Sequence, residues 1–150
     1  MRLANESDSQ QLLSWRNNPV VRKYSRNVQV ISRETHDLWL KNKLGENHLE
    51  SKIYIFSDSR NFIGMSRIDS LSVKLGELSI LVDPLFHSKG YGSKILNLSI
   101  EVAFDLLKYS ELAACIHRDN LASKALFSKY GFIKSHDEDL FEFFKLSKIV

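Results

Sequence analysis

The hydrophobic and polar positions of the chain alternate between strand-like and helix-like spacing. Residues 77–82 are largely apolar and β-branched, and Pro84 should end this strand because proline cannot extend a ladder. Apolar residues then recur at helical spacing over residues 95–107, which predicts a helix that begins at residues 91–93. The centre of the chain is therefore expected to form a strand, a turn and a helix.

The flanking segments continue this pattern on both sides. A short strand is expected at residues 2–4, followed by a helix capped near Ser7 or Asp8 and a second helix capped by Ser32. A polar loop is expected at residues 45–51. The remaining strands are expected at residues 52–56, 62–68, 112–117, 132–134 and 140–146, with a last helix between Asn120 and Gly131. The predicted order is strand, two helices, three antiparallel strands, helix, strand, helix and two strands.

The turn after the central strand has the chemistry of an anion site. Gly90 and Gly92 permit positive φ and a close approach of a ligand to the backbone. The helix that follows leaves amide donors free at its N-terminus, with the positive end of its dipole behind them. A P-loop is excluded because Lys89 precedes its glycine, and the dinucleotide fingerprint requires a third glycine. The turn therefore predicts phosphate binding through backbone amides.

Composition narrows the classes of protein that fit. A chain of 150 residues with 43% hydrophobic residues predicts one domain over residues 1–150. It contains no apolar run of membrane-spanning length and no signal peptide, so a cytoplasmic protein without a membrane partner is expected. The net charge is +3 with scattered basic residues, which does not indicate a nucleic-acid partner. The single cysteine, Cys115, excludes an internal disulfide and a multi-cysteine metal site, and a small buried residue is expected there.

Two stretches resemble the signatures of the Gcn5-related N-acetyltransferase (GNAT) family. The first is the pyrophosphate loop, Arg/Gln-x-x-Gly-x-Gly/Ala after a strand ending Val-Asp-Pro, and residues 87–92 match it except for His87 at the first position. The second is Asn-x-x-Ser/Ala-x-x-Leu-Tyr-x-x-x-Gly-Phe, which residues 120–132 match with Phe127 in place of the tyrosine. Because both motifs occur in the family's order, the whole chain is identified as similar to this family.

The resemblance implies a fold and a cofactor. The fold is α/β (α+β), with a mostly antiparallel sheet of about seven strands, helices on both faces and a splayed parallel pair of strands that binds acetyl-coenzyme A. Main-chain atoms of residues 80–82 should hold the pantetheine arm, and amides of residues 88–93 should hold the diphosphate. The residues expected to bind the cofactor are Ile80, Leu81, Val82, His87, Ser88, Lys89, Gly90, Tyr91, Gly92, Ser93, Asn120, Ser123 and Phe127.

Transfer to an amine also needs a base, and Glu77 is the first candidate. It can act directly or through a water held by Ser79, which should share its face of the strand, but a solvent-facing structural role fits Glu77 equally well. His117, at the end of the other strand of the pair, is the second candidate base. The backbone of Leu81 and Val82 is the expected donor to the thioester oxygen.

Phe127 stands where many relatives carry a tyrosine that protonates the departing thiolate. Two routes remain for a chain with phenylalanine here: release without an acid, which the thiol pKa permits, or a proton from Tyr130. A protein that binds coenzyme A without catalysis, as a sensor, is the competing interpretation.

The acceptor is expected to lie beside the first helices, where Pro19 should break the helix at Asn18. Trp15, Arg16, Asn17 and Tyr24 surround this break as candidate acceptor residues, or else form a helix end with solvated charges. The N-terminal half is similar to a subgroup that acts on nucleotide-linked amino sugars, although enzymes acting on ribosomal-protein N-termini or polyamines share its layout. The basic residues that favour a diphosphate-bearing acceptor over a polyamine are Arg16, Arg22, Lys23, Arg26 and Arg33.

These observations predict an acetyl-coenzyme A-dependent N-acetyltransferase. The expected acceptor is a small-molecule amine, first of all the 4-amino group of a UDP-linked amino sugar. The sequence leaves open whether the chain forms a homodimer.

Overall fold

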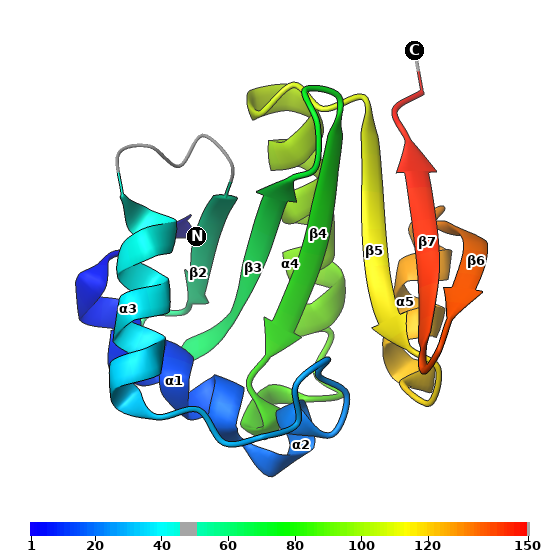
Figure 1. Ribbon diagram of the computed structural model, residues 1–150. Helices are drawn as coiled ribbons and strands as arrows, with labels where there is room; N and C mark the ends of the chain where they lie inside the picture. The colour runs from blue at the N-terminus through cyan, green and yellow to red at the C-terminus, as the bar shows by residue number, and fades with distance from the viewer. Residues whose placement is uncertain (46–50, 150) are drawn as a thin grey trace.

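The structure, a computed structural model that describes residues 1–45 and 51–149, is built around one mixed sheet (Figure 1). Most of the predicted polar loop at residues 45–51 lies outside the described residues. The strands are β1 (Arg2–Leu3), β2 (Ser51–Ser57), β3 (Phe62–Ser70), β4 (Leu75–Val82), β5 (Glu111–His117), β6 (Ile133–Glu138) and β7 (Phe141–Ser147). Their spatial order is β1-β2-β3-β4-β5-β7-β6, with β4 and β5 parallel and the other neighbours antiparallel. The predicted mixed, mostly antiparallel sheet is confirmed.

Apart from the short α2, the helices lie where the apolar spacing and capping residues predicted them. They are α1 (Ser9–Asn17), α2 (Pro19–Arg22), α3 (Arg33–Leu44), α4 (Tyr91–Glu101), which continues as a π-helical turn to Leu106, and α5 (Leu121–Lys129). Asn18 is extended before Pro19, so that the chain breaks between α1 and α2. Among the described residues, no helix combines the length and the apolarity needed to cross a membrane.

Alternation along the strands divides the core between the two faces of the sheet. On one face, α1 and α3 contribute Leu12, Trp15 and Leu40 to a core that includes Ile53 and Ile55 of β2. On the other face, α4 and α5 cover a larger core that includes Tyr54 and Phe56 from the same strand (Figure 1). Helices on both faces were predicted and are confirmed.

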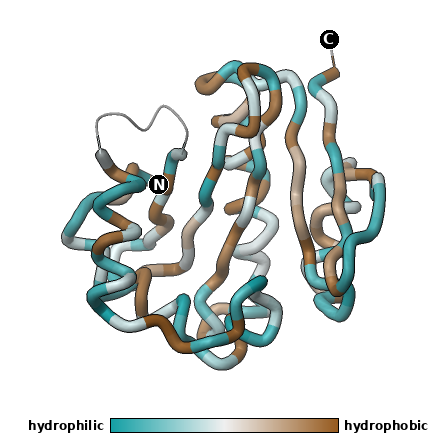
Figure 2. Tube along the Cα trace, in the orientation of Figure 1, coloured by the Kyte–Doolittle hydropathy of each residue, from teal (hydrophilic) through white to brown (hydrophobic). Residues whose placement is uncertain are grey.

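The edge strand β6 is longer than the pattern predicted. It was expected at residues 132–134 but extends to Glu138, paired with β7. All six of its residues are exposed, and most of the strand is hydrophilic (Figure 2). A solvated strand has no buried face, so it leaves no alternation of apolar residues for sequence analysis to detect.

The parallel pair of strands opens towards one end of the sheet. β4 and β5 pair only from Leu75 to Glu77 on one strand and from Glu111 to Ala113 on the other, although β4 continues to Val82 and β5 to His117. Figure 1 shows the two strands diverging beyond this point. Main-chain groups of residues 78–82 therefore face a gap, as the resemblance implied.

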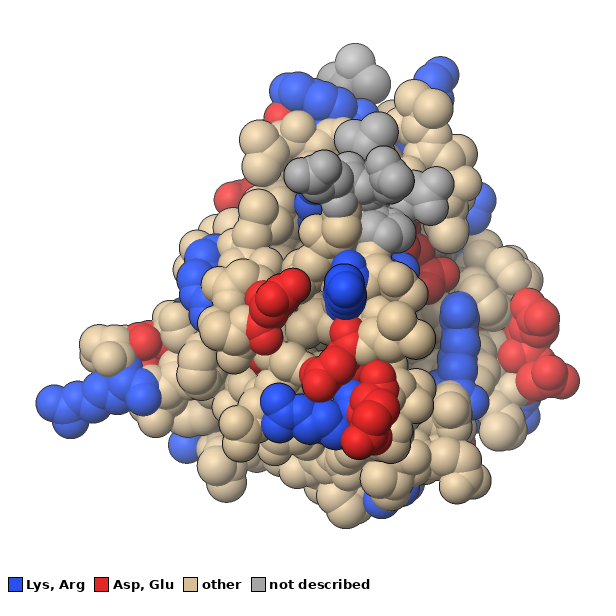
Figure 3. Space-filling view, turned by 60° about the vertical axis from the view of Figure 1, so that its left-hand side comes forward, with Lys and Arg blue, Asp and Glu red and all other residues tan. Residues whose placement is uncertain are grey.

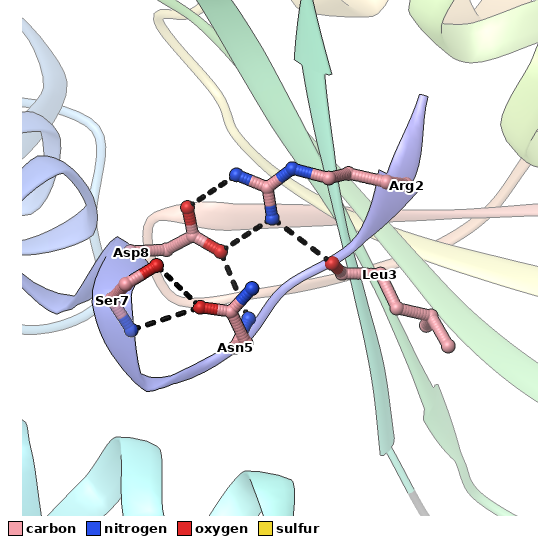
Figure 4. A network of polar contacts seen from close by, with 5 residues as sticks. All are labelled: Arg2, Leu3, Asn5, Ser7 and Asp8. Atoms are coloured by element: carbon pink, nitrogen blue, oxygen red, sulfur yellow. Dashed lines mark hydrogen bonds and ion pairs between the residues drawn. The ribbon is translucent and has the colours of Figure 1, made fainter.

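The N-terminal corner is held by a carboxylate rather than by the predicted cap (Figure 4). Asp8 precedes α1 but makes no side-chain capping bond there. Its carboxylate instead accepts two hydrogen bonds from Arg2, at 2.8 and 2.7 Å, and one from the backbone N–H of Asn5 at 2.8 Å. These bonds hold the pKa of Asp8 below its usual value. The helix begins where it was predicted, with Asp8 at its N-cap position, but the side-chain capping bond is not made, because the nearby guanidinium binds the carboxylate and Asn5 caps the preceding turn.

Candidate active site

The end of β4 is fixed by Asp83, whose carboxylate makes two contacts. One oxygen accepts the backbone N–H of Leu85 at 2.9 Å and so caps the short turn that follows. The other accepts the indole N–H of Trp15 at 2.7 Å. Trp15 is 2% exposed, so it connects α1 to the end of β4 and offers no surface to an acceptor. Its predicted role in acceptor binding was wrong.

The loop after β4 places two residues in the left-handed region before α4 begins. They are Ser88, with φ 59°, and Gly90, with φ 80°. A Cβ at Gly90 would meet nothing within 4 Å, and residues 87–90 are exposed. Gly92 instead lies within α4, where a Cβ would come within 3.1 Å of Leu126. The loop therefore presents backbone amides to solvent at a helix N-terminus, which is the geometry of an anion site.

Side chains of this loop turn back onto the protein. The Nε2 atom of His87 lies 2.9 Å from the carbonyl oxygen of Val82, so the ring donates to the end of β4. The ammonium of Lys89 donates to the carbonyl of Leu85 at 3.2 Å. His87, which replaces the first residue of the motif, thus fixes the loop to the end of β4. The backbone amides of the loop remain the groups available to a diphosphate.

The second wall of the gap is the N-terminus of α5. The side-chain oxygen of Asn120 accepts the backbone N–H of Ser123 at 3.2 Å, which leaves its NH2 group for a ligand. Phe127 is 3% exposed, with its ring 5.0 Å from that of Phe132. The structure places Phe127 in the core, which does not support the predicted contact with the cofactor. Tyr130 lines a separate hollow beside β6, which argues against it as the acid for the thiolate.

The candidate base and its neighbours share one face of the sheet. Leu78, Ile80 and Val82 pack into the core under α4, so Glu77 and Ser79 point to the opposite face, as strand alternation predicted. The same alternation in β5 directs Cys115 and His117 to that face, because Ala114 and Ile116 lie in the α4 core. Burial raises the pKa of the half-buried Cys115 thiol, which keeps it protonated and argues against a nucleophile.

Residues 23–32, which join α2 to α3, form an arch that polar side chains hold in place. Asn17 makes two hydrogen bonds to the backbone of Ile31, at 2.8 and 2.9 Å. Arg22 donates to the backbone carbonyls of Asn17 and Val28 at 3.0 Å each, and Arg16 donates to that of Asn27. Arg16 and Asn17 thus hold the arch together, and their role at the acceptor stays a prediction.

The arch carries Tyr24 and Arg26 over the face that holds Glu77. The ring of Tyr24 lies 5.6 Å from that of His117, which lies 5.3 Å from that of Phe141. The guanidinium of Arg26 lies 3.7 Å from the Glu77 carboxylate. Among the four predicted acceptor residues, Tyr24 thus lies beside His117 at the end of β5. The residues around Arg26 in the sequence indicate only its positive charge, because nothing in the local pattern points to the strand that it meets.

A hollow of about 510 Å³ opens beside Arg26 on this face. Its other lining residues are Glu138, Asp139, Leu140, Phe141 and Phe143. The hollow therefore combines carboxylates and one guanidinium with an apolar, aromatic wall.

Around α1 and α3, acidic and basic side chains are interspersed (Figure 3), and Arg33 is paired with Asp37 at 3.3 Å.

Residues 1–133 match the family model described as an acetyltransferase (GNAT) domain. The chain belongs to the GNAT family. It is 27% identical to the acetyltransferase PseH of Campylobacter jejuni strain 81-176 over 138 residues, which cover 91% of this chain and 85% of that protein. As a GNAT acetyltransferase, the chain is an enzyme whose cofactor is acetyl-coenzyme A.

Solved GNAT structures share its fold. The crystal structure of C. jejuni PseH superposes with a TM-score of 0.73 at 18% identity, covering 97% of this chain and 93% of that one. Spermidine N-acetyltransferase from Vibrio cholerae, solved with CoA and spermine, gives 0.84 at 15% identity, covering 96% and 90%. The ribosomal L7/L12 acetyltransferase RimL in complex with CoA gives 0.84 at 17% identity, covering 97% and 92%.

The loop and the gap of this GNAT chain fit the family's cofactor. Exposed amides after two left-handed residues suit a diphosphate, and the unpaired edge of β4 suits the amide-bearing pantetheine arm. When bound, acetyl-coenzyme A supplies an acetyl thioester that an amine can attack. The assignment of individual residues to the cofactor stays a prediction.

Proposed function

We propose that this GNAT enzyme acetylates the 4-amino group of a UDP-linked amino sugar. The observation that carries the proposal is the match to PseH proteins, at 25% and 27% identity over 91% of the chain, together with the sequence resemblance to the amino-sugar subgroup. The aromatic wall of the hollow supports it, because Phe141 and Phe143 line the space in which a sugar or uracil ring can pack.

The charge of the N-terminal half supports this acceptor less than the sequence suggested. Arg16 and Arg22 donate to backbone carbonyls within the arch, and Arg33 pairs with Asp37. Their guanidinium groups are therefore engaged away from the hollow. Among the structural features, the aromatic residues rather than a cluster of cations support a ring-bearing acceptor.

A polyamine is the second candidate acceptor, on one specific observation. Glu138 and Asp139 line the hollow, and Glu77 lies at the edge of the gap beside Arg26. Three carboxylates on one face would attract an acceptor with several ammonium groups. A direct comparison of acceptors separates the two candidates.

Glu77 is the better candidate base of the two that the sequence indicated. The backbone N–H of Asp119 donates to Nδ1 of His117 at 3.2 Å, so the proton of the neutral ring lies on Nε2. Nδ1 of His117 is therefore engaged by the backbone and is not the nitrogen open to a substrate. The Glu77 carboxylate can accept the proton of an ammonium directly or through a water held by Ser79.

The proposal is tested by release of free thiol from acetyl-coenzyme A by the purified protein. The acceptors compared are a UDP-linked 4-amino sugar, spermidine and an N-terminal peptide, with calorimetry of coenzyme A binding alongside. Turnover with the sugar nucleotide alone supports the proposal, and turnover with spermidine alone overturns it. Tight binding without turnover on any of the acceptors favours the sensor interpretation.

The assignment of the base is tested by Glu77→Gln. We expect transfer to fall while coenzyme A binding stays intact, because the substitution removes the proton acceptor and the carboxylate partner of Arg26 but leaves the loop after β4 unchanged. Glu111→Gln is the matched control. Glu111 lies on β5, on the same face of the sheet as Glu77, at the end where β4 and β5 are paired. Equal activity of the two variants would show that Glu77 is not the base.

A further inference from the structure

Arg26 is the side chain that reaches from the arch to the candidate base. Its Nη2 atom lies 3.7 Å from Oε2 of Glu77. Glu77 is also the last residue of β4 that pairs with β5, so this contact lies where the gap begins. The acceptor amine must approach the same carboxylate if Glu77 is the base, so the guanidinium lies where that amine is needed.

In the ion pair of Arg26 and Glu77, the arginine side chain is the more exposed one and is therefore the one that is free to move. The Arg26 side chain is 60% exposed, whereas that of Glu77 is 19% exposed. A separation of 3.7 Å exceeds the range of a good hydrogen bond, and exposed pairs of this kind are weak. The residues on either side of Arg26 are held in the arch, because Ser25 donates to the carbonyl of Val21 and Asn27 accepts from Arg16, so the side chain can leave Glu77 while the loop stays in place.

Other groups around the guanidinium provide a second position for it. Cys115 of β5, through a side-chain hydrogen bond, and the carboxylates of Glu77 and Glu138 raise the pKa of Arg26, so these groups surround the guanidinium. Glu138 and Asp139 line the hollow that Arg26 borders. A guanidinium displaced from Glu77 can therefore move to a carboxylate of the same hollow.

We infer that Arg26 occupies the place of the acceptor's ammonium group on Glu77 and that the acceptor must displace it before transfer. This inference rests on the proposed function. One ion pair replaces another of the same charge, so Glu77 keeps a cationic partner with and without acceptor. The displacement adds to the cost of binding the acceptor and not to the transfer step, because Arg26 has left Glu77 before the amine reacts. Arg26 thus sets the apparent affinity for the amine.

The test is Arg26→Gln, measured as thiol release with the UDP-linked 4-amino sugar. We expect its KM for the acceptor to fall by about two- to fivefold, the range of exposed ion pairs, with kcat unchanged. Arg26→Lys should restore the wild-type KM, and the difference between wild type and Arg26→Gln should shrink as NaCl is added. Arg33→Gln is the matched control, because Arg33 is 59% exposed and pairs with Asp37 instead.

The outcomes separate this inference from the proposed function. A KM that rises in Arg26→Gln would show that Arg26 contacts the acceptor itself, and an unchanged KM would show that it does not compete for Glu77. Either result overturns the inference while the enzyme remains active. If wild-type protein turns over another amine but not the sugar nucleotide, the proposed acceptor is wrong, and the KM comparison is made with that amine. If it turns over none, both proposals fail.

Discussion

A single methyl group added at Gly64 should disturb the site from the neighbouring strand. Gly64 lies on β3 opposite Val82 of β4. A Cβ there would be 2.2 Å from the carbonyl oxygen of Leu81 and 3.1 Å from the Cα of Val82, whereas real Cβ contacts essentially never fall below 3.0 Å. Bringing 2.2 Å to 3.0 Å requires a shift of about 0.8 Å. Since the obstructing atom is backbone, the end of β4 must move.

The expected losses follow from this shift. Overpacking of this kind costs about 1–3 kcal/mol in the free energy of unfolding, and each kcal/mol lowers the melting temperature by about 2–4 °C in a chain of this size. Leu81 and Val82 are the proposed backbone contacts of the thioester and the pantetheine arm. A misplacement near 1 Å can reduce a rate by about a hundredfold, so we expect Gly64→Ala to lower kcat/KM by about ten- to a hundredfold.

Gly76→Ala is the matched control for the loss of stability. A Cβ at Gly76 would be 3.0 Å from ring atoms of Tyr109 and 3.2 Å from a methyl of Ile68, at the end of β4 that is paired with β5. Both variants should melt at lower temperature than wild type, but only Gly64→Ala should lose activity in thiol-release assays at a temperature where both are folded. A Gly64→Ala protein with the kcat/KM of wild type would refute the role given to the backbone of Leu81 and Val82.

Three further substitutions test the loop, the end of β4 and the N-terminal corner. Gly90→Ala should weaken coenzyme A binding about tenfold in calorimetry, because an alanine at φ 80° costs about 1–2 kcal/mol. Its methyl group would meet nothing within 4 Å, so the effect comes from the backbone conformation, and an unchanged Kd would contradict this. Trp15→Phe should cost about 1–3 kcal/mol in chemical denaturation through loss of the bond to Asp83, and full wild-type stability would count against that bond. Asp8→Asn should destabilise the protein near pH 7 and progressively less below about pH 4. The bonds from Arg2 lower the pKa of Asp8 in the folded state, so its contribution is present above the unfolded pKa and lost as pH falls through the folded one; a stability difference independent of pH would refute this.

The sequence by itself determined the local elements and the family. Ser32 and Asn120 cap their helices, Gly90 takes a positive φ before α4, and Gly131 does so after α5. Each of these features depends on residues within one turn of the chain, so composition and spacing are enough to predict them. The two motifs and the alternation of β4 likewise predicted the loop and the face shared by Glu77 and Ser79.

The tertiary structure alone decided which side chains reach the site. Trp15 bonds to Asp83, 68 positions away in the sequence, and so lies in the core. Phe127 is buried because α5 packs that face onto the sheet, and Ser88 takes a positive φ that its residue type does not predict.

The arch shows the same dependence of side-chain contacts on the tertiary structure. Arg16 and Asn17 have the polar character of acceptor residues, yet they bind the backbone of the arch, while Arg26 extends to Glu77 on a strand about fifty residues later. A polar side chain interacts with whichever partner the folded chain brings near it, and the sequence specifies its chemistry but not that partner.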